Sequence, residues 1–167
     1  LEYTRLCSQF LAGILNGNDE GSISTLPLAY KQAEQSSDFS KRVIDQLLQL
    51  ARYLDTLHNE TGKIIRLAIE PEPFCVLETT LETIQFFERL WDAADKVALG
   101  GVVRQHIGVC YDVCHQAVEF ENPSTAIREL TEADIRINKV QISCAIELDN
   151  PTSETARQAL ATFAEQR

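Results

Sequence analysis

Ionisable side chains stand at the ends of two apolar runs of this sequence. The run 64–69 is followed directly by Glu70, and the run 107–111 is followed by Asp112 and, three residues later, by His115. Carboxylate oxygens and an imidazole nitrogen together suit a divalent ion such as Mn, Fe, Co, Zn or Mg. We therefore expect these three residues to form one metal site, in which Glu70 and His115 also take part in catalysis.

Each of the three residues also has a purely structural interpretation. Glu70 would pair with a neighbouring Lys or Arg, Asp112 would cap a helix, and His115 would hydrogen-bond a backbone carbonyl. The proline that follows Glu70 favours function, because it holds the carboxylate outside any helix. The spacing between Asp112 and His115 favours a shared ligand, since one helical turn presents both.

Polar residues at other strand ends are candidates for substrate binding. Glu72 lies two residues after Glu70, and Lys139 and Gln141 lie in a later strand-like run. We expect these side chains to contact substrate. A solvated turn residue is the alternative for Glu72, and a satisfied core amide is the alternative for Gln141. Further candidates for the same opening are Ser24 and Thr25.

Helical and strand-like segments alternate along the chain. This order is typical of parallel strands joined by crossovers. An eight-stranded barrel takes about 250 residues, so we expect an α/β fold, a (β/α) barrel of which residues 1–167 form one partial domain with about half of the strands. The expected helices are 1–17, 38–59, 80 to the break at Gly100, 123–132 and 151–167, and the expected strands are 23–28, 64–69, 107–111 and 135–142.

Charge and composition disfavour several classes of partner. A net charge of −10 over 167 residues disfavours nucleic acid, which is bound through clustered Lys and Arg. No apolar run approaches the roughly 18 residues of a membrane span, and no basic segment leads into an apolar stretch at the start. We therefore expect a cytoplasmic protein that binds a small molecule. The five cysteines are expected to be reduced thiols, without a disulfide framework.

Two further expectations concern the extent of the chain. The sequence contains no Met and begins with Leu1, from which we expect a piece of a longer chain. Half a barrel would expose strand edges and an apolar face, so we also expect association with another copy, as a homo-oligomer.

Several segments resemble a known superfamily. Residues 67–73, 108–115, 118–123 and 139–143 resemble the xylose-isomerase-like superfamily of TIM barrels, the sugar phosphate isomerases and epimerases. With residues 20–30 included, the sequence more narrowly resembles the EboE-type metabolite traffic proteins. The resemblance spans nearly the whole chain and implies a barrel of the xylose-isomerase-like TIM type.

The resemblance also implies a site and a chemistry. Glu70 matches the first acid of the superfamily, and Asp112 and His115 match its D-x-x-H motif, which together imply a divalent metal acting on a small polyol, sugar or secondary metabolite. The sequence departs from the pattern at Gln141, where the superfamily usually has His.

Three functions remain open at this point. The first is a metal-dependent sugar isomerase or epimerase, and the second is a metabolite-binding or trafficking protein without turnover, which Gln141 favours. The third is DNA repair of the endonuclease-IV-like kind, which the acidic charge disfavours.

Overall fold

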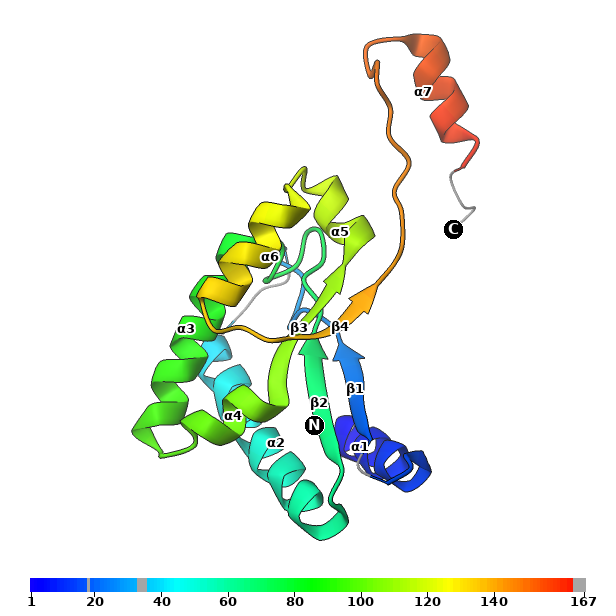
Figure 1. Cartoon of the computed structure of the whole chain (residues 1–167). Helices are drawn as coiled ribbons and strands as arrows, with labels where there is room; N and C mark the ends of the chain where they lie inside the picture. Colours follow the sequence, from blue (N-terminus) through cyan, green and yellow to red (C-terminus); the bar gives the residue numbers. More distant parts are fainter. Residues whose placement is uncertain (18, 33–35, 164–167) are drawn as a thin grey trace.

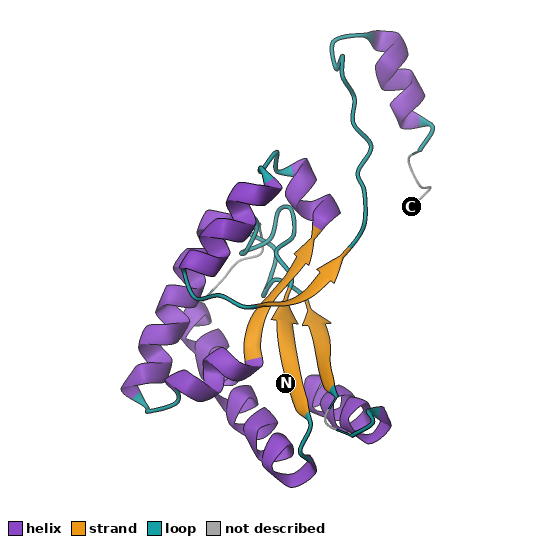
Figure 2. Cartoon of the chain, in the orientation of Figure 1, coloured by secondary structure: helices purple, strands orange, loops and turns teal. Residues whose placement is uncertain are grey.

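The computed structural model describes residues 1–17, 19–32 and 36–163, and their central feature is one parallel sheet (Figures 1 and 2). Its strands follow the order of the chain, β1-β2-β3-β4. The strands are β1 (Glu20–Thr25), β2 (Ile64–Ile69), β3 (Ile107–Asp112) and β4 (Ile137–Gln141). The helices are α1 (Glu2–Ile14), α2 (Phe39–Thr61), α3 (Thr80–Lys96), α4 (Gly100–His106), α5 (Val113–Val118), α6 (Pro123–Glu132) and α7 (Glu154–Ala161).

The two faces of the sheet have different surroundings. Helices α2, α3, α4 and α6 lie along one face (Figure 1), and the apolar side chains of β2 and β3 on that face enter the core. These core residues are Ile65, Leu67, Ile69, Ile107, Val109 and Tyr111. Side chains alternate along a strand, so Ala68 and Cys110 face the other way. Glu70 and Asp112, each two residues further on, continue that second face.

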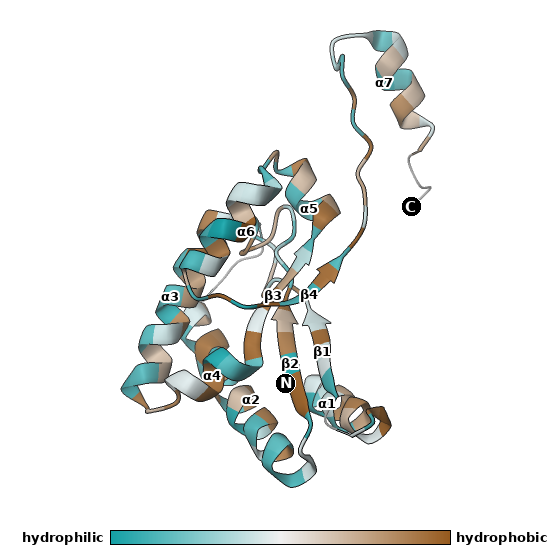
Figure 3. Cartoon of the chain, in the orientation of Figure 1, coloured by the Kyte–Doolittle hydropathy of each residue, from teal (hydrophilic) through white to brown (hydrophobic). Residues whose placement is uncertain are grey.

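Local signals at the helix ends explain where two of the helices lie. Thr79 and Glu82 form a reciprocal capping box at the start of α3, which satisfies backbone N–H groups that the helix leaves unpaired. Helix α2 ends at Gly62, whose φ of 72° is the left-handed conformation that glycine adopts without strain. Figure 3 shows hydrophilic and hydrophobic residues alternating along these helices, the pattern typical of helices that pack with one side against a core.

Glycine at position 108 allows β4 to approach β3 closely. A Cβ atom there would lie 2.3 Å from the Arg136 carbonyl oxygen and 2.6 Å from the Asn138 side-chain nitrogen, which is closer than packed atoms come. Asn138 in turn donates to the Leu67 carbonyl at 2.7 Å. The start of β4 therefore curls over the sheet, towards β2.

The expected fold class is wrong in its architecture. In a closed barrel every strand is paired on both sides, whereas β1 and β4 each have a single neighbour in the described part of the chain. The structure shows an α/β fold with a curled, open sheet of four parallel strands, and not a (β/α) barrel of the xylose-isomerase-like TIM type.

Several boundaries also differ from those expected. The first strand begins at Glu20 and ends at Thr25, before the proline at position 27 that lacks an N–H to pair. Gly100, expected as a break, begins α4. His106, the last residue of α4, is fully buried, and its Nδ1 lies 2.8 Å from the Ile65 carbonyl oxygen.

The last helix stands apart from the sheet. After β4 an extended connection leads to α7 (Figure 1), which buries no residue. The exposed fraction is 88% for Ile142 and 58% for Ile146, and Figure 3 shows apolar stretches along this connection. The helix expected at 151–167 is thus shorter, and its residues 164–167 lie outside the described part. Within the described residues, no helix combines the length and apolar character needed to cross a membrane.

Candidate metal centre

The three residues expected as metal ligands meet at the carboxyl ends of β2 and β3. Glu70 follows the last residue of β2, Asp112 ends β3, and His115 lies in the first turn of α5. One ligand atom from each residue lies within 4.8 Å of the other two. Two ligands on opposite sides of an ion are about 4.4 Å apart when each bond is about 2.2 Å, so these atoms are close to the spacing that one ion requires.

One carboxylate oxygen of Asp112 accepts hydrogen bonds, and the other accepts none in the described structure. Its Oδ1 accepts from the Ser143 hydroxyl at 2.6 Å and from the N–H groups of Cys114 at 2.8 Å and His115 at 3.3 Å. In the described structure its Oδ2 accepts no hydrogen bond. Burial by itself raises the pKa of Asp112, but the Ser143 hydroxyl, the two N–H groups and the nearby imidazole outweigh burial and lower that pKa. The group is therefore an anion at neutral pH, as a metal ligand must be.

His115 is oriented by the turn that follows Glu70. Its Nδ1 lies 3.1 Å from the Pro71 carbonyl oxygen and 3.5 Å from Glu70 Oε1. The tautomer that donates from Nδ1 to the carbonyl leaves Nε2 with its lone pair. Metal-bound histidines commonly donate their other ring N–H to a carbonyl in this way.

Glu70 is held by a residue at the end of β4. Gln141 Nε2 donates to Glu70 Oε2 at 2.6 Å and lies 3.2 Å from the sulfur of Cys110. Asp112 and Gln141 are paired in the β3–β4 register, which places the amide beside both carboxylates. Gln141 therefore contacts a ligand residue, where we had expected it to contact substrate.

Two other residues near the site are not positioned as ligands. Cys110 is fully buried, and burial raises the pKa of its thiol, so the sulfur stays protonated and is a poor ligand. Lys139 pairs with Cys110 in the strand register, and its side chain forms no hydrogen bond or ion pair within the described residues. Its expected contact with substrate stays a prediction.

A hollow of about 320 Å³ opens beside Glu70. Glu72 lines it together with Glu70, and the carboxylate of Glu72 has no hydrogen-bond partner in the described part of the chain. Ser24 and Thr25, which we expected at this opening, also line it. The remaining lining residues are Tyr3, Leu26 and Pro27. The volume matches the lower range of small-molecule sites.

Ser143 is one site residue that was not predicted from the sequence. Its hydroxyl donates the short hydrogen bond to Asp112 described above. A signal was present, because Ser143 lies two residues after Gln141 and such positions share a face of an extended chain. Tyr3 of α1 was missed as well, and no pattern in the sequence connects it with the strand ends.

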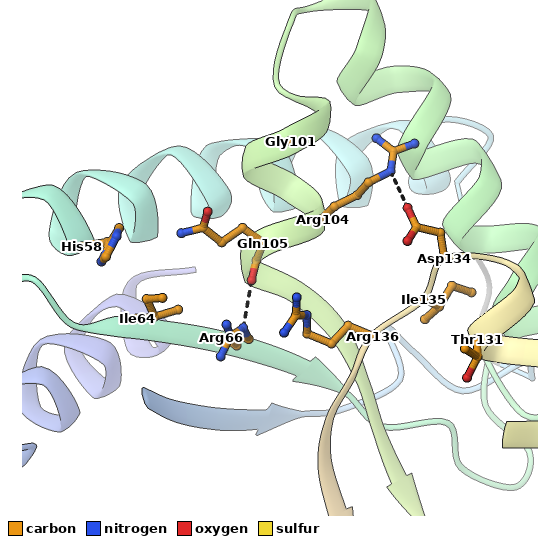
Figure 4. Close-up of a pocket in the computed structure, with 10 residues that line it drawn as sticks. All are labelled: His58, Ile64, Arg66, Gly101, Arg104, Gln105, Thr131, Asp134, Ile135 and Arg136. Carbon is orange, nitrogen blue, oxygen red and sulfur yellow. Dashed lines mark hydrogen bonds and ion pairs between the residues drawn. The ribbon is translucent and has the colours of Figure 1, made fainter. Parts of the chain in front are cut away.

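A hollow of about 690 Å³ lies at the opposite, amino ends of the strands (Figure 4). The arginines that line it are largely paired within the protein. Arg66 donates to the Gln105 carbonyl and to Glu20, and Arg104 pairs with Asp134. Two further lining groups, the Arg136 guanidinium and Nδ1 of His58, have no hydrogen-bond partner in the described part of the chain. Within the same residues, however, no set of metal-ligand atoms like that at the carboxyl ends gathers here.

Comparisons with known proteins give one likeness of fold. No family model matches the chain, and no curated protein does. A solved structure, the crystal structure of 3-keto-D-glucoside 4-epimerase, YcjR, from E. coli in its apo form, is similar with a TM-score of 0.51 and 15% sequence identity. The match covers 95% of this chain and 67% of that one.

These findings correct both family assignments made from the sequence. Neither the xylose-isomerase-like TIM-barrel superfamily nor the EboE-type metabolite traffic family is supported, because no family model matches and the sheet is open. The segments that suggested them are short strand ends, and such apolar runs ending in an acid arise in many parallel α/β folds. At 15% identity the likeness to the epimerase structure concerns the fold alone.

Proposed function

We propose that this chain binds one divalent metal ion through Glu70, Asp112 and His115 and acts on a small polyol or sugar by isomerase- or epimerase-type chemistry. The observation that carries the proposal is the convergence of two carboxylates and one imidazole within 4.8 Å. The fold likeness to a solved sugar epimerase is in keeping with it. The donor set suits Mn, Fe, Co, Zn or Mg.

The residues around the ion have distinct roles in this proposal. A bound divalent ion would polarise a carbonyl or hydroxyl oxygen of the substrate. The hollow beside Glu70 holds the rest of the substrate, and Ser24 offers it a hydroxyl. Glu72 lines the same hollow with an uncommitted carboxylate, so it accepts a hydrogen bond from a substrate hydroxyl and is the group available to take up and return a proton.

A second candidate is ligand binding without turnover. The observation that favours it is the contact between Gln141 and Glu70. An amide cannot exchange a proton as histidine does, and here it also occupies one oxygen of the central carboxylate. The site would then hold a metabolite, with or without metal, and leave it unchanged.

Elemental analysis separates these functions when it is combined with proton exchange. The full chain is purified beside Glu70→Gln and Asp112→Asn, with Glu88→Gln and Asp92→Asn on the exposed face of α3 as matched controls. Near-stoichiometric metal in the parent and controls, lost in both site variants, supports the metal centre. Solvent deuterium that enters C–H positions of a monosaccharide panel supports turnover.

The remaining outcomes are equally decisive. Metal without deuterium exchange, together with ligand-induced stabilisation, favours the binding function. A parent protein that stays metal-free after incubation with each candidate ion contradicts the metal centre.

A further inference from the structure

In each of the two carboxylates of the site, one oxygen accepts a side-chain hydrogen bond and the other does not. Glu70 uses Oε2 for the hydrogen bond from Gln141 at 2.6 Å, and Asp112 uses Oδ1 for the hydrogen bond from Ser143 at 2.6 Å. The other oxygen of each carboxylate accepts no hydrogen bond in the described structure. Each group is thus held at one oxygen and open at the other.

Both holding groups come from one short segment at the end of β4. Gln141 is the last residue of that strand and lies opposite Asp112 in the register with β3. Ser143, two residues further on, donates to Oδ1 of Asp112, the oxygen that also accepts from two backbone N–H groups. The Ser143 oxygen itself accepts from the Cys114 N–H at 3.0 Å. This segment supplies none of the three proposed metal ligands, yet it contacts both carboxylates among them.

The orientation of the Gln141 amide follows from its partner. A carboxylate oxygen only accepts, so the atom 2.6 Å from Glu70 must be the amide nitrogen. The same nitrogen lies 3.2 Å from the sulfur of Cys110, which can accept a second hydrogen bond from it. These two neighbours leave the amide with one favourable orientation.

We infer that Gln141 and Ser143 are positioning residues that make Glu70 and Asp112 bind the ion through one oxygen each. The inference rests on the proposed function. A carboxylate that is held at one oxygen by a short hydrogen bond does not rotate to coordinate an ion through both oxygens. Coordination positions on the ion therefore remain open for substrate oxygens. The same restriction selects among ions, because Ca²⁺ needs six to eight oxygens and often takes carboxylates bidentately. The site therefore favours Mn²⁺ over Ca²⁺.

The test uses the metal alone, with no substrate. Mn²⁺ and Ca²⁺ affinities are measured by calorimetry on the full chain and on Ser143→Ala, Ser143→Thr and Gln141→Leu. Loss of a group that orients a metal ligand typically weakens binding about 10- to 100-fold. We expect that loss of Mn²⁺ affinity in Ser143→Ala and Gln141→Leu, a smaller loss of Ca²⁺ affinity, and near-parent affinity in Ser143→Thr, which keeps the hydroxyl.

Controls separate positioning from folding. Ser143 and Ser124 are both exposed, so without metal Ser143→Ala should lose no more stability than one hydrogen bond to Asp112 contributes, and the matched control Ser124→Ala should melt at the parent temperature. Gln85→Leu on the exposed side of α3 is the control for Gln141→Leu. The visible spectrum of bound Co²⁺, which reports ligand geometry, should change in the two site variants and stay unchanged in both controls.

The outcomes distinguish this inference from the function on which it rests. If the parent binds Mn²⁺, and Ser143→Ala and Gln141→Leu bind it within twofold of the parent with the same Co²⁺ spectrum, the positioning role is overturned and the metal centre stands. If the parent binds none of these ions, both ideas fall together.

Discussion

At the amino ends of the strands, all three nitrogens of the Arg66 guanidinium donate hydrogen bonds, to Glu20 and to the Gln105 carbonyl. At the carboxyl ends, by contrast, Glu70 and Asp112 each keep one oxygen without a hydrogen bond in the described structure. The first arrangement satisfies its charges internally and stabilises the fold. The second gathers like charges and leaves part of them unsatisfied, which costs stability unless a cation binds. The contrast indicates which end of the sheet is built for a ligand.

The largest expected effect is at the carboxyl ends. Glu70→Gln and Asp112→Asn each remove a charged ligand but keep the shape of the side chain, and Asn still caps α5. We expect metal affinity to fall at least about 100-fold, or about 2.7 kcal/mol, in calorimetric titrations. Urea unfolding of the metal-free variants should show no large loss of stability. Unchanged metal affinity in either variant would remove that residue from the centre.

A substitution at the amino ends should lower stability and leave metal affinity unchanged. Arg66→Met keeps the apolar stem of a buried side chain but leaves Glu20 and the Gln105 carbonyl without their donor. Because the Glu20 side chain is 52% exposed, water replaces part of the loss, and we expect a cost of about 1–2 kcal/mol in urea unfolding. Metal affinity should stay at the parent value. A change in both quantities would show that the two ends are coupled.

The pH dependence of stability provides a smaller test at the same end. Burial lowers the pKa of His106, although the Ile65 carbonyl and Asp55 oppose this effect, while His58 and Arg66 reinforce it. The unfolded histidine therefore takes up a proton first as pH falls below about 6.5, and stability declines in that window until the folded pKa is reached.

The variant His106→Asn isolates this contribution. Its amide N–H can replace the Nδ1 donor to the Ile65 carbonyl, so the fold is kept while the titrating group is removed. Urea unfolding at a series of pH values from 7.5 to about 5 should show a flatter profile than the parent. An identical slope in parent and variant would assign the decline to other groups.

The smallest expected effect concerns an exposed ion pair beside the same hollow. Arg104 pairs with Asp134, whose side chain is 79% exposed. Exposed pairs contribute about 0–1 kcal/mol, so Asp134→Asn should change the free energy of unfolding by less than about 0.5 kcal/mol. A loss above 1 kcal/mol would mean that surface pairing at the amino ends is stronger than exposure allows.

Local patterns in the sequence predicted part of this structure well. Periodicity located the long helix α2 and the buried strands β2 and β3, because both depend on residues close together in the chain. The ends of those strands placed Glu70 and Asp112 on one sheet edge for the same reason. Four parallel strands were also expected and are present, but their assignment to a TIM barrel was wrong, because strands alternating with helices occur in many α/β folds and the alternation does not report how the sheet closes.

The holding contacts at Gln141 and Ser143 depend on register. The β3–β4 pairing shifts between Val109 and Cys110, and this irregularity decides which β4 residue lies beside Asp112. Register is set by packing and by turns far along the chain. A single sequence does not show it, and so Gln141 was expected to contact substrate and Ser143 was overlooked.

The detached position of α7 has a consequence for local unfolding. A helix that buries no residue opens at almost no free-energy cost, so its amides and those of its connection should exchange with solvent quickly, whereas β2 and β3 exchange only when the whole sheet opens. The boundary between fast and slow exchange falls at the end of β4, where Gln141 and Ser143 lie. The candidate site therefore spans the most rigid and the most easily opened parts of the molecule.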